Sequence, residues 1–336
     1  MKYITVGQAS IDRSIRPDGS IIGINLGGPG VFAYTGIRLY DDNCQMILNV
    51  AEDFEPKYGD WIRRNMVNTD ACYLCYDKTH AYDLIYSEDG SYYQADMSEK
   101  EKYDRAGEYG WTNVRPEQIE RHTRNAEGLY IFIEPTYEQY WKQLADIKER
   151  HHLQIMYEIG IAKGGDYDRD HVLKVLDILK PQMASLNHNE SCDFFGIEDR
   201  EEIFRRIDSW NIPLFFYRAG EEGSYVLYDH KSYFCPSLTI EGRESLDPTG
   251  CGNSSTAACM WAWMNTHNPV MTGWLANIVG AYNVSYKGII SEFTKEMRDH
   301  AFDLAISRYN DYVKDNPEYV EAGYPAKGEE VLKDIR

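Results

Sequence analysis

Short apolar runs alternate with amphipathic segments along the chain from about residue 115 onward. Five apolar runs have the length and composition of buried strands: Gly128–Ile133, Leu153–Tyr157, Met183–Leu186, Pro213–Tyr217 and Tyr225–Tyr228. Between them, apolar residues recur at helical spacing, which predicts helices at Tyr137–Arg150, His171–Leu179 and Arg200–Trp210. Apolar strands separated by amphipathic helices are typical of a parallel sheet that helices cover on both faces. The pattern therefore predicts an α/β fold with a central, mostly parallel sheet, whose ligands bind at the carboxyl ends of the strands.

The first hundred residues have a different rhythm, in which strand-like and turn-like segments follow one another closely. One hairpin is predicted within about residues 10–26. A second is predicted between Ala81–Tyr86 and Ser91–Ala95, within about residues 78–97. We expect the two hairpins to form a small β lid on a single domain that spans residues 1–336.

The net charge of −19 excludes one class of partner. Nucleic-acid binding depends on clustered Lys and Arg that neutralise phosphates, and the sequence has no such cluster. An acidic protein that binds ATP needs a local device for the phosphates, such as backbone amides, Mg²⁺ or single basic residues.

The location of the protein is predicted from what the sequence does not contain. No apolar run approaches the ~20 residues that span a bilayer, and the start of the chain reads as a strand without a signal-peptide pattern. Seven cysteines without a repeated spacing argue against a disulfide framework. Cys72 and Cys75 form a lone CxxC in a strand-like segment, with no second pair nearby to complete a zinc site. We expect a cytoplasmic protein without membrane contact.

The segment Asp247–Asn253 is the most informative stretch of the chain. Its two glycines permit backbone conformations that other residues avoid, and a helix begins directly after it. The free N–H groups and the dipole of a helix N-terminus make a site for a phosphate. Taken alone, the segment is equally consistent with an ordinary loop in which Asn253 caps the helix.

The chain resembles the ribokinase (PfkB) family of carbohydrate and nucleoside kinases. The late signature of that family reads Asp-Thr/Pro-Thr-Gly-Ala-Gly-Asp, and Asp247–Asn253 matches it except for Cys251 at the Ala and Asn253 at the final Asp. Further segments agree in the family's order: Gly7 with Asp12, Gly27-Gly28 before a helix that ends in Arg38-Leu39, Asn187-His188-Asn189-Glu190, and the turn Arg218–Gly223. The resemblance runs from about residue 3 to 290 and implies a ribokinase-like fold.

The resemblance also implies roles for individual residues. On the acceptor side, Asp12 would accept hydrogen bonds from substrate hydroxyls, and Gly27 and Gly28 would let the substrate approach the backbone. Phe32 stands where the family often has a substrate-binding Asn. At the reacting phosphate, the amides of Gly250, Cys251 and Gly252 would stabilise the transferring group.

The residues implied for the nucleotide and its metal form a second set. Glu190 would act near Mg²⁺ through metal-bound water. The implied ATP-binding residues are Asn187, Glu190, Arg218, Gly220, Gly223 and Asn277, where Arg218 replaces the family's Thr and Asn277 adjoins the adenine. Several candidates keep a plainer interpretation: Asp12 as a turn residue, Asn187 as a helix cap, Glu190 as a solvated carboxylate and Asn277 as a helix-surface residue.

Asn253 stands where the family has the Asp that takes the proton from the attacking hydroxyl. An amide accepts no proton near neutral pH, and general-base assistance is worth ~10²–10⁴-fold. Three accounts remain open: a natural branch that is slow or uses another carboxylate, an engineered Asp→Asn change, and a protein that binds ligand without catalysis. Glu134 and Glu158 each follow a strand and could replace the base, bind substrate, or be loop carboxylates.

The aromatic residues of the second hairpin are a further candidate for substrate contact. Tyr82, Tyr86, Tyr92 and Tyr93 could stack on a sugar or a nucleobase, although alternating Tyr is also typical of a half-buried strand.

The sequence thus predicts an ATP- and Mg²⁺-dependent phosphotransferase that acts on a hydroxyl of a sugar, nucleoside or polyol. The alternative is a catalytically silent relative that binds a sugar or nucleotide. A homodimer through the lid is implied by family likeness alone.

Overall fold

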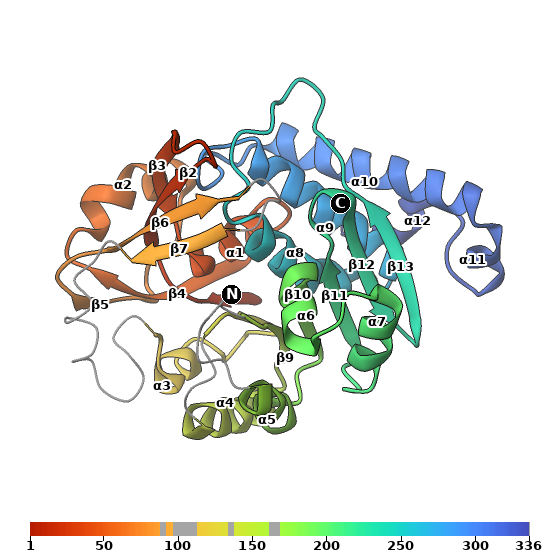
Figure 1. Ribbon diagram of the computed structural model, residues 1–336, viewed down its shortest axis with the longest axis horizontal. Coiled ribbons are helices and arrows are strands. Elements are labelled where there is room, and N and C mark those ends of the chain that lie inside the picture. The colour runs from red at the N-terminus through yellow and green to blue at the C-terminus, as the bar shows by residue number, and fades with distance from the viewer. Residues whose placement is uncertain (88–91, 97–112, 134–137, 161–168, 336) are drawn as a thin grey trace.

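The structure is a computed structural model that describes residues 1–87, 92–96, 113–133, 138–160 and 169–335. The strands of its larger sheet are β1 (Tyr3–Val6), β4 (Cys44–Ala51), β5 (Cys72–Tyr76), β8 (Gly128–Ile131), β9 (Gln154–Glu158), β10 (Met183–Asn187), β11 (Leu214–Arg218), β12 (Gly223–Tyr228) and β13 (Lys231–Pro236). Their order in space is β13-β12-β11-β10-β9-β8-β1-β4-β5 (Figure 1).

The direction of the strands changes at one end of this sheet. Every neighbouring pair from β5 to β11 is parallel, whereas β12 and β13 are antiparallel to their neighbours. Only a short turn, which contains the 3₁₀ segment Gly220–Glu222, joins β11 to β12. A parallel connection needs a crossover of about a dozen residues, so this turn dictates a hairpin. The prediction of a central, mostly parallel sheet is confirmed.

Helices cover both faces of the larger sheet (Figure 1). One face carries α1 (Pro29–Arg38), α2 (Phe54–Asn65), α8 (Cys251–Thr266), α9 (Pro269–Val284) and α10 (Lys295–Asp315), with α11 (Pro317–Glu321) and α12 (Gly328–Leu332) against α10. The other face carries α3 (Pro116–Glu120), α4 (Glu138–His151), α5 (Arg169–Leu179), α6 (His188–Phe195) and α7 (Arg200–Asp208). Successive residues of the buried strands alternate between the two cores: Tyr3 belongs to one cluster and Ile4 to the other.

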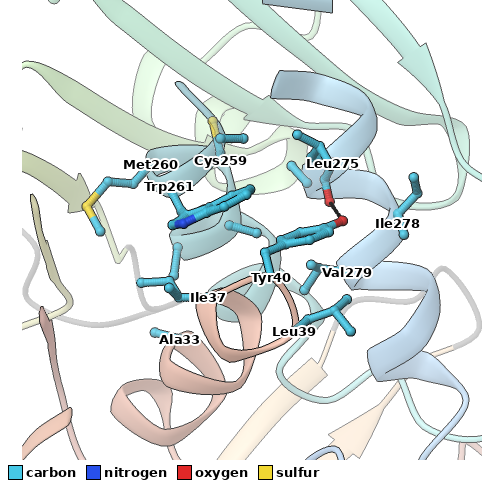
Figure 2. Close-up of a cluster of buried hydrophobic side chains, with 14 of the residues drawn as sticks. Ala33, Ile37, Leu39, Tyr40, Cys259, Met260, Trp261, Leu275, Ile278 and Val279 are labelled. Atoms are coloured by element: carbon cyan, nitrogen blue, oxygen red, sulfur yellow. Dashed lines mark hydrogen bonds between the residues drawn. The ribbon is translucent and has the colours of Figure 1, made fainter. Parts of the chain in front are cut away.

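Helices α1 and α8 lie side by side and run in the same direction. The ring of Phe32 lies on Gly250 just before α8, and one turn further along both helices Gly36 lies on Ser254. A methyl group on Gly36 would be 2.1 Å from the Ser254 carbonyl oxygen, so the backbones touch here. Beyond this contact Tyr40 stacks on Trp261, with ring centroids 4.9 Å apart, and donates a hydrogen bond to the carbonyl of Leu275 on α9 (Figure 2).

A smaller sheet of four strands lies beside the larger one (Figure 1). It is made of β2 (Ser10–Ile15), β3 (Ile21–Gly27), β6 (His80–Tyr86) and β7 (Tyr92–Asp96), in the order β3-β2-β6-β7. Each predicted hairpin is present as an antiparallel pair, and the parallel pairing of β2 with β6 joins them. One face of β2 carries Ser10, Asp12 and Ser14, all buried and polar.

Two further observations concern the cysteines and the helices. All seven cysteines, each within the described residues, are free thiols, and Cys72 and Cys75 lie in strand β5. In the described part of the chain no helix has both the length and the apolar character needed to cross a bilayer.

Candidate active site

The turn before α8 is held rigidly by its own side chains. Asp247 is buried and accepts hydrogen bonds from the backbone N–H and the hydroxyl of Thr249, at 3.0 and 2.6 Å. Gly250 follows with φ +79° and forms the N-cap of α8. A Cβ at this position would be 2.1 Å from the Phe32 ring, so both the backbone angle and the space require glycine.

Several backbone N–H groups of this turn have no acceptor in the part of the chain that the structure describes. Among the described residues, the amides of Gly250, Gly252 and Asn253 find none, whereas that of Cys251 donates to the Pro248 carbonyl at 3.1 Å. Free amides at the start of a 16-residue helix form an anion site. Burial raises the pKa of the Cys251 thiol to about 12, so this side chain stays neutral.

The side chain of Asn253 is held by hydrogen bonds to two buried residues. Its Nδ2 donates to Glu158 Oε1 and to the Tyr130 hydroxyl, both at 3.2 Å. The Tyr130 hydroxyl in turn donates to Glu158 Oε2 at 2.5 Å. Glu158 and Tyr130 are both fully buried, at the carboxyl ends of β9 and β8.

Arg218, at the end of β11, completes this group. Its Nη2 lies 3.1 Å from Glu158 Oε1 and 3.6 Å from Glu190 Oε2, and its Nε donates to the Ser185 hydroxyl at 3.1 Å. The guanidinium also lies against the N-terminal turn of α8: a Cβ on Gly252 would be 2.0 Å from Nη1. Residues from four parallel strands and two helices, α6 and α8, therefore converge at the carboxyl edge of the sheet.

Asn187 and Glu190 cap the helix that they begin. The Asn187 Oδ1 accepts the Glu190 N–H at 2.8 Å, and a Glu190 carboxylate oxygen accepts the Asn187 N–H at 3.0 Å. The capping interpretation of Asn187 is therefore correct, whereas Glu190 is a capping residue beside Arg218 and not the solvated carboxylate of the plainer interpretation. Its second carboxylate oxygen lies outside the cap. Burial raises the pKa of Glu190 to about 7, although Arg218 acts in the opposite direction.

The acceptor side of the site is built from β2, β3 and the start of α1. Asp12 is buried, and the Ser10 hydroxyl donates to it at 2.6 Å. Burial raises the pKa of Asp12 to about 6, against hydrogen bonds from Ser10 and the Gly28 amide. A Cβ on Gly27 would overlap the Asp12 carboxylate, and Gly28 has φ +98°, so each of these glycines is required where it stands.

Tyr58, on α2, is a residue of this region that the sequence did not identify. It is fully buried, and its hydroxyl lies 2.5 Å from the Ser10 carbonyl and 3.0 Å from the Gly27 carbonyl. These contacts fasten β2 and β3 next to Asp12. An aromatic residue on the apolar face of a helix is normally a core residue, so the sequence carried no signal for this role.

The smaller sheet is bonded to the turn before α8. The Ser14 hydroxyl lies 3.1 Å from Asp247 Oδ2 and 2.9 Å from the Thr249 hydroxyl, and the Tyr86 hydroxyl lies 2.7 Å from the same Thr249 oxygen. Tyr86 therefore contacts the turn directly, and Tyr82 shares a 2.9 Å hydrogen bond with His80. The side chains of Tyr92 and Tyr93, and the whole of Glu134, lie outside the described residues.

The predicted nucleotide residues lie around the turn from β11 to β12. Gly220 and Gly223 both have positive φ, +60° and +131°. The side chain of Asn277, on α9, donates to the carbonyls of Cys235 and Pro236 and accepts from Ser224. Asn277 thus joins α9 to β12 and β13, which is more than a helix-surface residue does; its proximity to adenine stays a prediction.

Two continuous groups of contacts result. The first group consists of Asp12, Gly27, Phe32 and Gly250. The second consists of Gly252, Asn253, Glu158, Arg218 and Glu190. They meet where the turn enters α8. Most of the predicted site residues are therefore brought together.

The fold and this arrangement define a ribokinase-like protein, and the resemblance to the ribokinase family of nucleoside and sugar kinases is confirmed. No protein-family model matches the chain. The cytidine kinase of Thermococcus kodakarensis is 25% identical over 268 residues, which cover 76% of this chain and 85% of that protein.

Solved structures agree on the fold. The adenosine kinase from Sinorhizobium meliloti has a TM-score of 0.70 at 14% identity, over 90% of this chain and 98% of that one. Arabidopsis thaliana ribokinase, complexed with ribose and ATP, has a TM-score of 0.67 at 16% identity, over 90% of this chain and 98% of that one.

Proposed function

We propose that the protein is an ATP- and Mg²⁺-dependent kinase that phosphorylates a hydroxyl group of a nucleoside, sugar or polyol. The observation that carries the proposal is the contact of Phe32 with both Gly27 and Gly250. This contact places a buried carboxylate, Asp12, in one continuous group with the free amides that begin α8. The names of the relatives support kinase chemistry and leave the acceptor open.

Each part of the site has a task in this reaction. Asp12 accepts hydrogen bonds from the acceptor's hydroxyls and orients it, and Gly27 and Gly28 leave room for it at the backbone. The amides of Gly250, Gly252 and Asn253 bind the phosphoryl group in transit, where developing charge is greatest. The smaller sheet, joined to the turn through Ser14 and Tyr86, acts as a lid that excludes water from the acceptor.

The donor set fits an Mg²⁺ that arrives with ATP. Mg²⁺ is usually held by one or two carboxylates, by substrate phosphates and by waters. Among the described residues no cluster of three or more His, Cys, Asp or Glu could hold a metal, whereas Glu190 has one carboxylate oxygen outside its helix cap. Glu190 would hold the ion through water, and the ion would neutralise phosphate charge.

An acceptor panel tests the proposal. Nucleosides, sugars and polyols are screened by thermal shift with and without Mg²⁺–ATP, because a ligand that binds the native state raises apparent stability. Each ligand that binds is then assayed for ADP release and for the phosphorylated product. We expect at least one acceptor to be phosphorylated; no ATP binding at millimolar concentration would overturn the proposal. The silent alternative rests on Asn253 alone, and the comparisons give it no support.

Acceptor use should depend on pH through Asp12. Since the pKa of this buried carboxyl is raised to about 6, it becomes protonated below pH 6 and loses its ability to accept two hydroxyl donors. At saturating Mg²⁺–ATP the cation near Glu190 favours the ionised form of that carboxylate, so the pH profile reports Asp12. We expect kcat/KM for the acceptor to fall about tenfold per pH unit below 6 and to be level above it. Asp12→Asn should lower kcat/KM and abolish this acid limb, while Asp18→Asn, in the exposed turn of the same hairpin, should retain it. An acid limb that persists in Asp12→Asn would contradict the assignment.

A further inference from the structure

The two clearest departures from the family's motifs are neighbours in space. Arg218 stands where the family has Thr, and Asn253 where it has Asp, 35 positions apart in the chain. In the structure both contact the same atom, Glu158 Oε1: Arg218 Nη2 forms an ion pair with it at 3.1 Å, and Asn253 Nδ2 donates a hydrogen bond to it at 3.2 Å. Two substitutions that share one buried acceptor form a single unit.

Arg218 lies beside the helix N-terminus that would bind a transferring phosphate. Its Nη1 occupies the space next to the Cα of Gly252, in the first turn of α8, where the amides of Gly252 and Asn253 are free. Its side chain is only 13% exposed, so its charge is poorly screened by water. The Ser185 hydroxyl and the carboxylates of Glu158 and Glu190 fix the guanidinium from the opposite side.

The same geometry explains why residue 253 is an amide. An Asp side chain here would bring a second carboxylate to about 3 Å from Glu158, and neighbouring carboxylates that share a site cannot both ionise readily. It would also compete with Glu158 for Arg218. Asn253 instead donates an N–H to Glu158 Oε1, and Tyr130 donates its O–H to Oε2. Both carboxylate oxygens of Glu158 thereby accept a hydrogen bond, and one also pairs with Arg218, which suits a fixed counter-ion better than a proton acceptor.

We propose that Arg218 is a catalytic residue that stabilises the charge of the transferring phosphoryl group, and that Glu158 and Asn253 are positioning residues that hold it there. This proposal rests on the proposed kinase function. In the step, the acceptor oxygen forms a bond to the γ-phosphorus of ATP. The bond from that phosphorus to the bridging oxygen breaks, and its electron pair leaves with ADP. The hydroxyl proton passes to an oxygen of the transferred phosphoryl group and stays with the phosphorylated product.

Such a step depends little on a strong base. Phosphoryl transfer relies mainly on positioning and electrostatic stabilisation, and an arginine aimed at the transferring group is worth ~10³–10⁵-fold in other phosphotransferases. In this chain the fixed positive charge of Arg218 therefore contributes to catalysis in place of the proton acceptor that the family has at the position of Asn253.

Kinetics of four variants on an acceptor that the wild type phosphorylates test this proposal. Arg218→Gln should lower kcat about 100-fold or more while KM for the acceptor changes less than about threefold, because the guanidinium acts on the phosphoryl group. Arg218→Lys should fall between Gln and wild type. Added guanidinium should partly restore the activity of Arg218→Ala, an effect that a merely structural arginine would not show. Arg206→Gln, on the exposed face of α7, is the matched control and should equal wild type.

Variants that change the number of carboxylates next to Arg218 give the most decisive comparison of kcat. Asn253→Asp should lower kcat about tenfold by like-charge repulsion, and adding Glu158→Gln to it should recover activity because one carboxylate and one amide are again present. A higher kcat in Asn253→Asp alone, or an unchanged kcat in Arg218→Gln, would overturn this proposal and leave the kinase function intact. A wild type that transfers phosphate to no acceptor would overturn both. Thermal unfolding of each variant separates loss of fold from loss of chemistry.

Discussion

Gly250→Ala should lower kcat/KM for phosphoryl transfer about 1000-fold, the upper range for loss of preorganised donors to the reacting group. The new methyl group would be 2.1 Å from the buried ring of Phe32, and the φ of +79° costs a non-glycine residue ~1–2 kcal/mol. The turn must move to relieve both, and the free amides of α8 move with it. Steady-state kinetics and urea unfolding measure the two consequences separately.

Gly242→Ala is the matched control for this variant. Gly242 has φ +74°, almost the same as Gly250, but it is exposed and a Cβ there would meet nothing within 4 Å. It should have a similar backbone cost and wild-type kinetics. Equal kinetic losses in the two variants would show that the contact with Phe32 has no part in catalysis.

Gly36→Ala should lower the free energy of unfolding by about 3 kcal/mol, the cost of overpacking a tight interior. Its methyl group would lie 2.1 Å from the Ser254 carbonyl oxygen, and a backbone atom cannot rotate away as a side chain can. Helices α1 and α8 would have to separate, which would loosen the stacking of Tyr40 on Trp261. Urea denaturation at constant slope would measure the change.

Gly280→Ala provides the comparison, because Gly280 is also a glycine within a helix. A Cβ there meets nothing within 4 Å, so alanine should stabilise α9 by up to ~1 kcal/mol. Opposite signs for the two variants are therefore expected. A Gly36→Ala protein as stable as Gly280→Ala would mean that the two helices are not in backbone contact.

The layers of the fold could be predicted from the sequence because a strand that is buried on both faces consists mainly of apolar residues. A strand such as Tyr3–Val6 is buried throughout and apolar except for Thr5, and helices with one apolar face separate such strands. The sequence was not sufficient for strand direction at the edge. Tyr225–Tyr228 has the composition of a parallel strand, and only the short connection from β11 makes β12 antiparallel.

At the site, the sequence identified the residues that hold a fixed position in a family motif, but not the residues that contact them. Glycine at 27, 28 and 250 could be recognised because backbone angle and space restrict those positions to one residue type. Tyr58 could not, since its hydroxyl is bonded to backbone groups of Ser10 and Gly27, on two other elements. Glu158 could be placed at a strand end, but its pairing with Asn253 depends on how strand β9 and helix α8 pack.

The parallel course of α1 and α8 has an electrostatic consequence. Between the contact of Phe32 with Gly250 and that of Gly36 with Ser254, both helices advance by four residues in the same direction. Their N-termini therefore face the same space. Each N-terminus carries about half a positive elementary charge, and two like ends repel each other. Buried packing such as Tyr40 on Trp261 holds the helices together against this repulsion. An anion bound between the two ends turns the repulsion into a shared attraction, so its binding stabilises this part of the molecule.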